Sequence, residues 1–326
     1  MPKGRGGPRS AIYAARQDRN DVAAAEKLST SNGLVTPRNG QSVLAQGLAF
    51  KAYEIEDLVV VCFFRPLGFI VARCAAAFQL TPTHVTVFGA LVGIAGGAML
   101  YDQRLGLYGF ALLIMHGIVD SADGQLARLT GQATELGRVL DGVSGYLTHG
   151  AIYIAIAAGV IHRGGSGAIL IWMVLAGIAN AAQAQMYEYH RHDYARIVVK
   201  GIAPSDDSAK VTSACMKSLY GRYLATARML NGLHVEVESL ITARSAAGVV
   251  REEDRARYRE CFYAPVRGWN LLGDNMRRFA IGLLVYLSRL DLFFAFILLP
   301  MNLALIALWL WQRTADRRFL RNSVTG

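Results

Sequence analysis

Six long apolar stretches alternate with polar segments along this chain. Each approaches the length of about 20 residues that an α-helix needs to cross a hydrocarbon core of about 30 Å. The stretches lie near 83–102, 107–126, 139–161, 167–186, 274–289 and 291–312. This pattern predicts an all-α integral membrane protein with a bundle of six transmembrane helices. The last two stretches are joined by a tight loop, which leaves a re-entrant pair open as an alternative.

The amino-terminal region contains two different segments. Residues 1–50 are basic and lack an apolar core, so we expect a flexible tail and no cleaved signal peptide. Residues 51–80 are apolar but interrupted by Arg65, Pro66 and Arg73. This interruption favours a helix that lies along the membrane interface with snorkelling arginines over a seventh crossing.

A charged segment separates the fourth apolar stretch from the fifth. Within it, the Ser-Asp-Asp-Ser run at 205–208 is typical of a helix start, and the run at 251–255 predicts a charged helical face. We therefore expect a cytoplasmic helical insertion, either as a solvated hairpin or as a lid or partner surface. The predicted order is a basic tail (1–50), an interfacial helix (51–80), transmembrane helices one to four (81–186), the insertion (187–272), transmembrane helices five and six (273–313) and a basic cytoplasmic tail (314–326).

The positive charges predict an orientation in the membrane. Alternate loops hold only Arg104, Arg163 and Arg289 as fixed positive charges, and the other basic residues fall on the opposite side. By the Lys/Arg bias of loops, both termini and the loop Leu129–Arg138 are cytoplasmic. The net charge of +10 gathers at the ends of apolar runs and in the tails, so we expect membrane phospholipids as partners and no nucleic acid. The abundance of Ala, Gly and Arg favours a bacterial inner membrane.

Three carboxylates lie at the cytoplasmic ends of the second and third stretches. Asp120 and Asp123 share one helix face, and Asp141 belongs to the next helix. Ionisable groups at membrane depth are costly unless they are paired, hydrated or bound to metal. If the two helices pack side by side, the carboxylates converge on one pocket. Oxygen ligands of this kind favour Mg²⁺, Mn²⁺ or Ca²⁺ over zinc.

Small residues and an arginine accompany these acids. Gly124 and Gly137 leave room for a nucleotide to approach, although glycines in a bilayer also serve close helix packing. Ala127 and Arg128 follow one turn later, and the guanidinium of Arg128 can offer a forked pair of donors to a pyrophosphate. Helix packing by itself would not require three acids and an arginine.

The stretch from Asp120 to Asp141 resembles the signature of the CDP-alcohol phosphotransferase (CDP-alcohol phosphatidyltransferase) family. That signature is Asp, two residues, Asp-Gly, two residues, Ala-Arg, a spacer of about eight, Gly, three residues, Asp, three residues, Asp. The chain matches it as far as Asp141, with a spacer of eight residues. Leu80–Thr86 is also similar to the Thr-Pro-Asn-x-Val-Thr start of the family's first span, with Thr83 in place of Asn.

The resemblance implies a dimeric six-helix bundle with a cytoplasm-facing polar cavity. It implies that Asp120, Asp123 and Asp141 hold a pair of Mg²⁺ or Mn²⁺ ions. The residues that would border the CDP moiety are Asp123, Gly124, Ala127, Arg128 and Gly137. The implied reaction is attack of an alcohol on the β-phosphorus of a CDP-linked donor, with release of CMP. The favoured donor is CDP-diacylglycerol with a small polar alcohol as acceptor; a soluble CDP-alcohol with a lipid alcohol is the alternative.

One position departs from the family's pattern. The last Asp of the signature, which serves the family as a metal ligand and general base, is Gly145 here. Positioned base catalysis is worth about 10² to 10⁴ in rate. Three explanations stay open. The metal ions alone suffice to ionise the acceptor; His149, four residues further along the same helix stripe, joins Asp141 as a catalytic residue; or the chain is a catalytically silent nucleotide- or lipid-binding homologue. A transporter fits less well, because its site is expected near the membrane midplane.

Other polar positions in the spans have two interpretations each. Asn180, Gln183 and Gln185 either face the acceptor or hydrogen-bond a neighbouring helix, and we favour the second. Arg277 and Arg278 either meet lipid phosphate or only set the topology.

Overall fold

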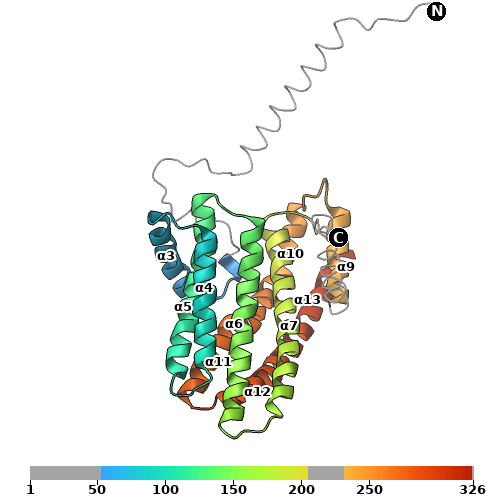
Figure 1. Ribbon diagram of the computed structural model, residues 1–326. Helices are drawn as coiled ribbons and strands as arrows, with labels where there is room; N and C mark the ends of the chain where they lie inside the picture. The colour runs from blue at the N-terminus through green and yellow to red at the C-terminus, as the bar shows by residue number, and fades with distance from the viewer. Residues whose placement is uncertain (1–52, 205–230, 325–326) are drawn as a thin grey trace, which may run out of the picture. The chain divides into compact units, whose positions relative to one another are not determined.

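The computed structural model describes residues 53–204 and 231–324, and this part of the chain is helical without a β-strand. Figure 1 shows the long helices running up and down in a bundle. The helices are α3 (Arg65–Ala77), α4 (Pro82–Met99), α5 (Gly106–Thr130), α6 (Glu135–His162), α7 (Ile169–Tyr194), α9 (Gly232–Arg244), α10 (Glu252–Gly268), α11 (Asp274–Tyr286), α12 (Phe293–Leu298) and α13 (Pro300–Val324). Short 3₁₀ or π turns join them at η1 (Tyr53–Ile55), η2 (Val60–Phe64), η3 (Ala195–Val199), η5 (Trp269–Leu272) and η6 (Leu290–Leu292).

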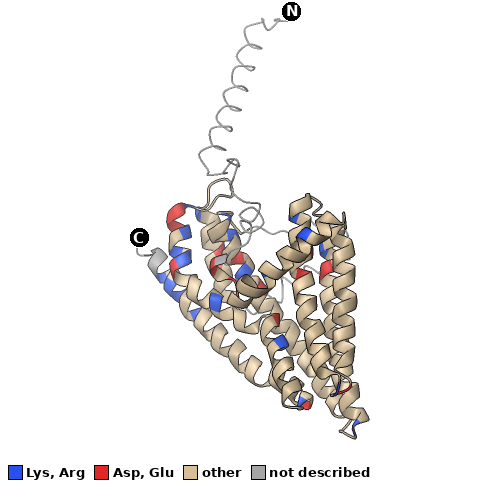
Figure 2. Ribbon diagram, turned by 90° about the vertical axis from the view of Figure 1, so that its left-hand side faces the viewer, with Lys and Arg blue, Asp and Glu red and all other residues tan. Residues whose placement is uncertain are grey.

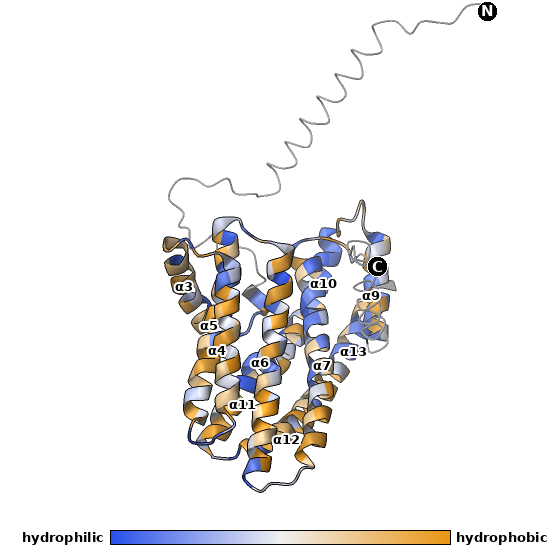
Figure 3. Cartoon of the chain, viewed as in Figure 1, coloured by the Kyte–Doolittle hydropathy of each residue, from blue (hydrophilic) through white to orange (hydrophobic). Residues whose placement is uncertain are grey.

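The described residues include 5 stretches long and apolar enough to cross a membrane, as expected of an integral membrane protein. They are Val60–Ala77, Pro82–Met99, Leu136–His162, Ile169–Val199 and Leu290–Arg321. Figure 3 shows hydrophobic residues concentrated in the lower part of the bundle, and hydrophilic residues at the opposite end. That opposite end, which carries α9 and α10, is called the polar end below.

Four of the six predicted spans coincide with these stretches, and two do not. α5 has 25 residues but is less apolar than the others, because His116, Asp120 and Asp123 lie within it. α11 has only 13 residues. At the helical rise, α11 is about 20 Å long, which is shorter than a hydrocarbon core of about 30 Å. The count of six spans therefore stays a prediction, and α11 is too short to cross a bilayer by itself.

Glycines let α4 pack closely against both of its neighbours. A Cβ added at Gly96 would lie 3.0 Å from the carbonyl oxygen of Gly109 in α5, and one at Gly97 would lie 2.9 Å from the backbone nitrogen of Ile152 in α6. Small residues at such contacts are typical of helices packed in membranes. α4 thus holds α5 and α6 on two of its sides, whereas α5 and α6 make little direct contact with each other.

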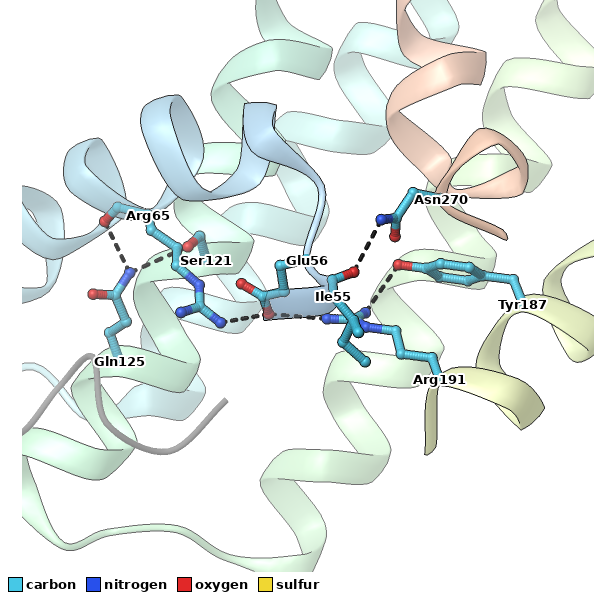
Figure 4. Close-up of polar contacts among 8 residues, drawn as sticks. All are labelled: Ile55, Glu56, Arg65, Ser121, Gln125, Tyr187, Arg191 and Asn270. Atoms are coloured by element: carbon cyan, nitrogen blue, oxygen red, sulfur yellow. Dashed lines mark hydrogen bonds and ion pairs between the residues drawn. The ribbon is translucent and has the colours of Figure 1, made fainter. Parts of the chain in front are cut away.

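A buried charge network anchors the segment before α4 inside the protein (Figure 4). Glu56 is 3% exposed and accepts hydrogen bonds from Arg65 at 2.5 Å and from Arg191 of α7 at 2.9 Å. The prediction that Arg65 snorkels to the membrane interface is wrong, because its side chain is buried against Glu56. The stretch Val60–Ala77 is long and apolar enough to cross a membrane, so its interfacial placement stays a prediction.

The segment predicted as an insertion contributes helices to the polar end. α7 continues through η3, and both α9 and α10 pack against α13. Tyr194, Tyr258 and Phe262 are fully buried in the core that these helices share. Figure 2 shows Lys, Arg, Asp and Glu gathered on these helices and sparse in the lower half of the bundle. The insertion therefore packs around an apolar core that it shares with α13.

The predicted tail at 314–326 is not a tail over the residues that the structure describes. α13 continues to residue 324, with Ala315 and Phe319 buried against the core of α9 and α10. The reason is that small and aromatic side chains form an apolar face between the basic residues of this segment. The predicted amino-terminal tail (1–50) and the predicted helix start at 205–208 lie outside the described residues.

Candidate active site

The predicted motif lies at the polar end, on the last turns of α5 and the first turns of α6. α5 ends at Gly131, whose φ of +68° is readily adopted only by glycine. α6 begins after Thr134, whose hydroxyl oxygen accepts a hydrogen bond from the backbone N–H of Gly137 at 3.0 Å. These two caps produce a short reversal of the chain. The two halves of the motif are therefore brought to the same end of the bundle.

Asp123 is fixed by a residue from a third helix. The hydroxyl of Thr86 on α4 donates to Oδ2 of Asp123 at 2.7 Å, and both residues are 7% exposed. Such a partner orients a metal-binding carboxylate and limits its rotamers. Behind the motif, Gln125 donates to the carbonyl oxygen of Arg65 at 3.1 Å, which ties α5 to α3 (Figure 4).

Asp120 and Asp141 occupy exposed positions on their helices. The side-by-side packing of the two motif helices assumed from the sequence is not found, because α4 packs against both and they barely touch each other. The ligand atoms of Asp120, Asp123 and Asp141 do not all lie within 4.8 Å of one another. A divalent pair nevertheless fits these residues, since a two-metal site with ions about 3.5–4 Å apart needs ligands from a wider span than a single ion does.

The small residues of the motif have different surroundings. A Cβ added at Gly124 would lie 3.6 Å from a guanidinium nitrogen of Arg128, so the arginine lies over this glycine. A Cβ added at Gly137 would lie 3.0 Å from the capping hydroxyl of Thr134. Ala127 is half-buried. The guanidinium of Arg128 and the backbone of Gly124 thus lie on the same stretch of α5.

Gly145 faces open space. A Cβ added at Gly145, or at Gly142 one turn earlier, would meet no heavy atom within 4 Å. Close helix packing therefore does not explain either glycine. An aspartate side chain would fit at position 145 without moving a neighbour.

His149 lies between the backbone of α6 and the start of α11. Its Nδ1 lies 2.8 Å from the carbonyl oxygen of Gly145, and its Nε2 lies 3.6 Å from Oδ1 of Asp274 at the start of α11. Both neighbours are acceptors, so the ring suits the doubly protonated form, which donates from both nitrogens. His149 also lies about 12 Å along α6 from Asp141 at the helical rise. This geometry favours a role as a donor over the predicted role as a base.

A small cavity lies between α5, α6 and α11, beside His149. Its polar lining consists of His116, Thr148, His149, Tyr153, Asp274, Arg277 and Arg278. One ring nitrogen of His116 bonds the carbonyl oxygen of Gly89 in α4 at 2.9 Å. Opposite charges among these groups pair with one another, which lowers the cost of holding charged and polar side chains at membrane depth.

Arg277 points into the bundle, not toward lipid. It is 3% exposed and donates to the carbonyl oxygen of Leu272 at 2.8 Å and to the side-chain oxygen of Gln183 at 3.0 Å. Gln183 in turn donates to Asn302 of α13 at 2.8 Å. The interpretation of Arg277 as a ligand for lipid phosphate is therefore wrong, and the interpretation of Gln183 as an interhelical hydrogen-bonding residue is confirmed.

Sequence reasoning missed the roles of Thr86 and Asp274. Thr86 belongs to the segment that resembles the family's first span, and that position was the available signal. Asp274 lies in the first turn of α11, where the helix dipole favours acidic residues whether or not they have another role. Only the packing of α11 reveals its approach to His149.

Comparisons with known proteins agree with the motif. Residues 79–237 match the family model described as CDP-alcohol phosphatidyltransferase. The chain is 30% identical over 93 residues to an archaetidylinositol phosphate synthase of Pyrococcus horikoshii, covering 28% of this chain and 49% of that relative. It is 30% identical over 82 residues to a phosphatidylinositol phosphate synthase of Mycobacterium marinum, covering 25% of this chain and 35% of that relative. The matches thus span about half or less of these curated relatives.

Proposed function

Because residues 79–237 carry a domain of the CDP-alcohol phosphatidyltransferase family, we propose that this protein is a membrane phosphotransferase of phospholipid synthesis. It transfers a phosphatidyl or phospho-alcohol group from a CDP-linked donor to an alcohol and releases CMP. CDP-diacylglycerol is the favoured donor. The relatives support this choice, because their names describe synthases of phosphatidylinositol phosphate and archaetidylinositol phosphate.

The observation that carries the proposal is the motif at the polar end. Asp120, Asp123 and Asp141 would hold Mg²⁺ or Mn²⁺, with Asp123 positioned by Thr86. A bound divalent pair would neutralise the pyrophosphate and lower the pKa of the acceptor hydroxyl.

The small residues and the arginine of the motif would contact the nucleotide. Gly124, Ala127 and Gly137 would give the CDP moiety access to the backbone of the two helices. Arg128, which lies over Gly124, would donate a forked pair of hydrogen bonds to the pyrophosphate. The donor would thereby be oriented for in-line attack at the β-phosphorus.

Ionisation of the acceptor without the family's last aspartate is the remaining chemical question. His149 is placed between a carbonyl and a carboxylate, which supports a role in holding α11 beside the site over a role as base. We therefore propose that the native chain relies on the metal-lowered pKa of the acceptor and works more slowly than a chain with a positioned base. The proposal includes a homodimer in a bacterial inner membrane, with the polar end in the cytoplasm.

Release of CMP from the purified protein tests this function. The protein is supplied with CDP-diacylglycerol plus a polar alcohol, or with a soluble CDP-alcohol plus diacylglycerol, each with Mg²⁺ or Mn²⁺. We expect metal-dependent CMP release with the first pair of substrates, and we expect Asp123→Asn to abolish it. Release with the second pair alone would reverse the assigned donor. The absence of CMP from all combinations would refute the enzymatic function and favour the silent homologue to which Gly145 points.

A further inference from the structure

A second cluster of ligand-type side chains lies at the polar end, outside the motif. Asp193 from the end of α7, and His234 and Glu238 from α9, have ligand atoms that all lie within 4.8 Å of one another. Asp193 and His234 are 7% and 1% exposed, and Glu238 is half-buried. Within 53–204 and 231–324, no other three His, Cys, Asp or Glu residues meet this spacing.

His234 is oriented as a metal-binding histidine would be. Its Nδ1 lies 2.7 Å from Oδ1 of Asp316 on α13, so the ring donates to a buried carboxylate. A neutral imidazole that donates from Nδ1 keeps a lone pair on Nε2, and a carboxylate partner of this kind is common for metal-bound histidine. The hydroxyl of Tyr258 lies 3.1 Å from Nε2, and a bound ion would replace this contact.

Two carboxyl groups meet beside this histidine. The carboxyl of Asp193 is within hydrogen-bonding reach of Glu238, whose Oε1 accepts from the hydroxyl of Tyr189. Oδ2 of Asp193 is buried and has no hydrogen-bond partner among the described residues. Arg196 adds a positive charge near these two acids. Two such acids need a proton or a cation between them.

A further histidine borders the cluster. His190 is 1% exposed, stacks on Trp269 with ring centroids 4.9 Å apart, and lies edge-on to His234 at 5.0 Å. Neither of its ring nitrogens makes a hydrogen bond of standard geometry to the described residues, and the amide of Asn231 is its polar neighbour. His234 supplies the imidazole nitrogen beside the two carboxyl groups, a ligand that suits Zn²⁺ and similar ions, and His190 packs against its ring.

We propose that Asp193, His234 and Glu238 bind one divalent first-row transition-metal ion, with Zn²⁺ as the reference. Nitrogen and carboxylate ligands bind Zn²⁺ at about 2.0–2.2 Å, so ligand atoms around one ion lie at most about 4 Å apart. Small side-chain rotations from the observed spacing reach that geometry. The ion would join α7 to α9, and through the contact of His234 with Asp316 it would also hold α13. This site is independent of the proposed enzymatic activity.

The test uses the full-length protein in detergent, stripped with a chelator and reloaded with one equivalent of ZnCl₂. X-ray absorption at the zinc edge then reports whether imidazole nitrogen is bound. His116 and His149 lie beside the motif, so imidazole scattering is assigned to the second cluster by its loss in His234→Gln. We expect this scattering in the native chain and in Asp120→Asn, which separates this site from the proposed active site.

Matched variants on α9 measure affinity. Glu238→Gln removes a ligand, whereas Glu236→Gln changes an exposed acid on the same helix. We expect Glu238→Gln to weaken zinc binding at least tenfold and Glu236→Gln to leave it unchanged. Asp316→Asn, which removes only the partner of His234, is expected to weaken binding by about 10- to 100-fold.

Three results would overturn the proposal. The first two are zinc bound without imidazole scattering and no zinc bound at all in the native chain; the two acids would then share a proton. The third is equal zinc affinity in Glu238→Gln and Glu236→Gln. If His234→Gln does not fold, the comparison of these two variants on α9 decides.

Discussion

Replacing Gly145 by aspartate is the sharpest test of the proposed site. A Cβ at this position meets no heavy atom within 4 Å, so the new side chain costs no repacking. Within a helix, Gly→Asp changes intrinsic propensity by only about 0.3 kcal/mol in the favourable direction. Stability is therefore expected to be almost unchanged, and any change in rate reflects the site.

The expected rate change follows from the missing carboxylate. Position 145 lies one helical turn beyond Asp141, on the same face of α6. A carboxylate there would add a metal ligand and a base, and positioned base catalysis is worth at least about 10²-fold. That factor corresponds to about 2.7 kcal/mol of transition-state stabilisation. We expect Gly145→Asp to raise metal-dependent CMP release from CDP-diacylglycerol by this amount.

Gly142→Asp is the matched control for this substitution. Position 142 also has open space around its Cβ and lies on the same helix, but it is turned by about 100° around the helix axis from Asp141. The control adds the same charge and the same helix propensity at a different angle to the site. An equal rise in both variants would refute the argument from position. Loss of a robust native activity in Gly145→Asp would show that Gly145 provides space for the acceptor.

Three further predictions concern the metal, the buried charges and the orientation. Thr86→Val removes the hydrogen bond to the carboxylate of Asp123 and is expected to weaken Mn²⁺ binding by about 10- to 100-fold, whereas Thr86→Ser retains the hydrogen bond. Equal Mn²⁺ affinities of the two variants in a titration would contradict the role of Thr86 in positioning Asp123. Glu56→Gln removes the carboxylate charge that pairs with buried Arg65 and half-buried Arg191, and it is expected to cost about 3–5 kcal/mol in the free energy of unfolding, against almost nothing for the exposed Glu260→Gln. Similar melting temperatures of the two variants would disprove this expectation. In a chain without native cysteines, a cysteine replacing Gln132 is expected to react with impermeant reagents only from the cytoplasmic side, and one replacing Ser166 only from outside; the opposite labelling would reverse the topology.

The sequence predicted the family and most of the membrane helices. The resemblance seen from Asp120 to Asp141 is confirmed by the family match over residues 79–237. Four apolar stretches coincide with membrane-length helices, because length and hydropathy are local properties of the chain. α5 was predicted as a span although its acids lower its hydropathy, and the structure gives it membrane length. The roles of the motif residues themselves stay predictions.

The errors fall on side chains whose partners are distant in the sequence. Arg65 was expected to snorkel, because an arginine in an apolar segment usually reaches for water. Instead it binds Glu56, and the same carboxylate binds Arg191 from α7. The segment after residue 313 was expected to be a tail, because its basic residues are conspicuous. Phe319 is instead buried, and it stabilises the helix only because it packs against the core of α9 and α10.

What the sequence determined by itself was most of the membrane-length helices, their order and the spacing of the motif's acids, since helix length and hydropathy are properties of short stretches of the chain. What the tertiary structure decided was which groups meet. Thr86 reaches Asp123 across 37 positions of the sequence, and α4 stands against both motif helices where direct contact between them was assumed. His234 meets Asp316 across 82 positions. Such contacts depend on how whole helices pack, because burial and close approach are properties of several segments at once and leave no pattern in any one of them.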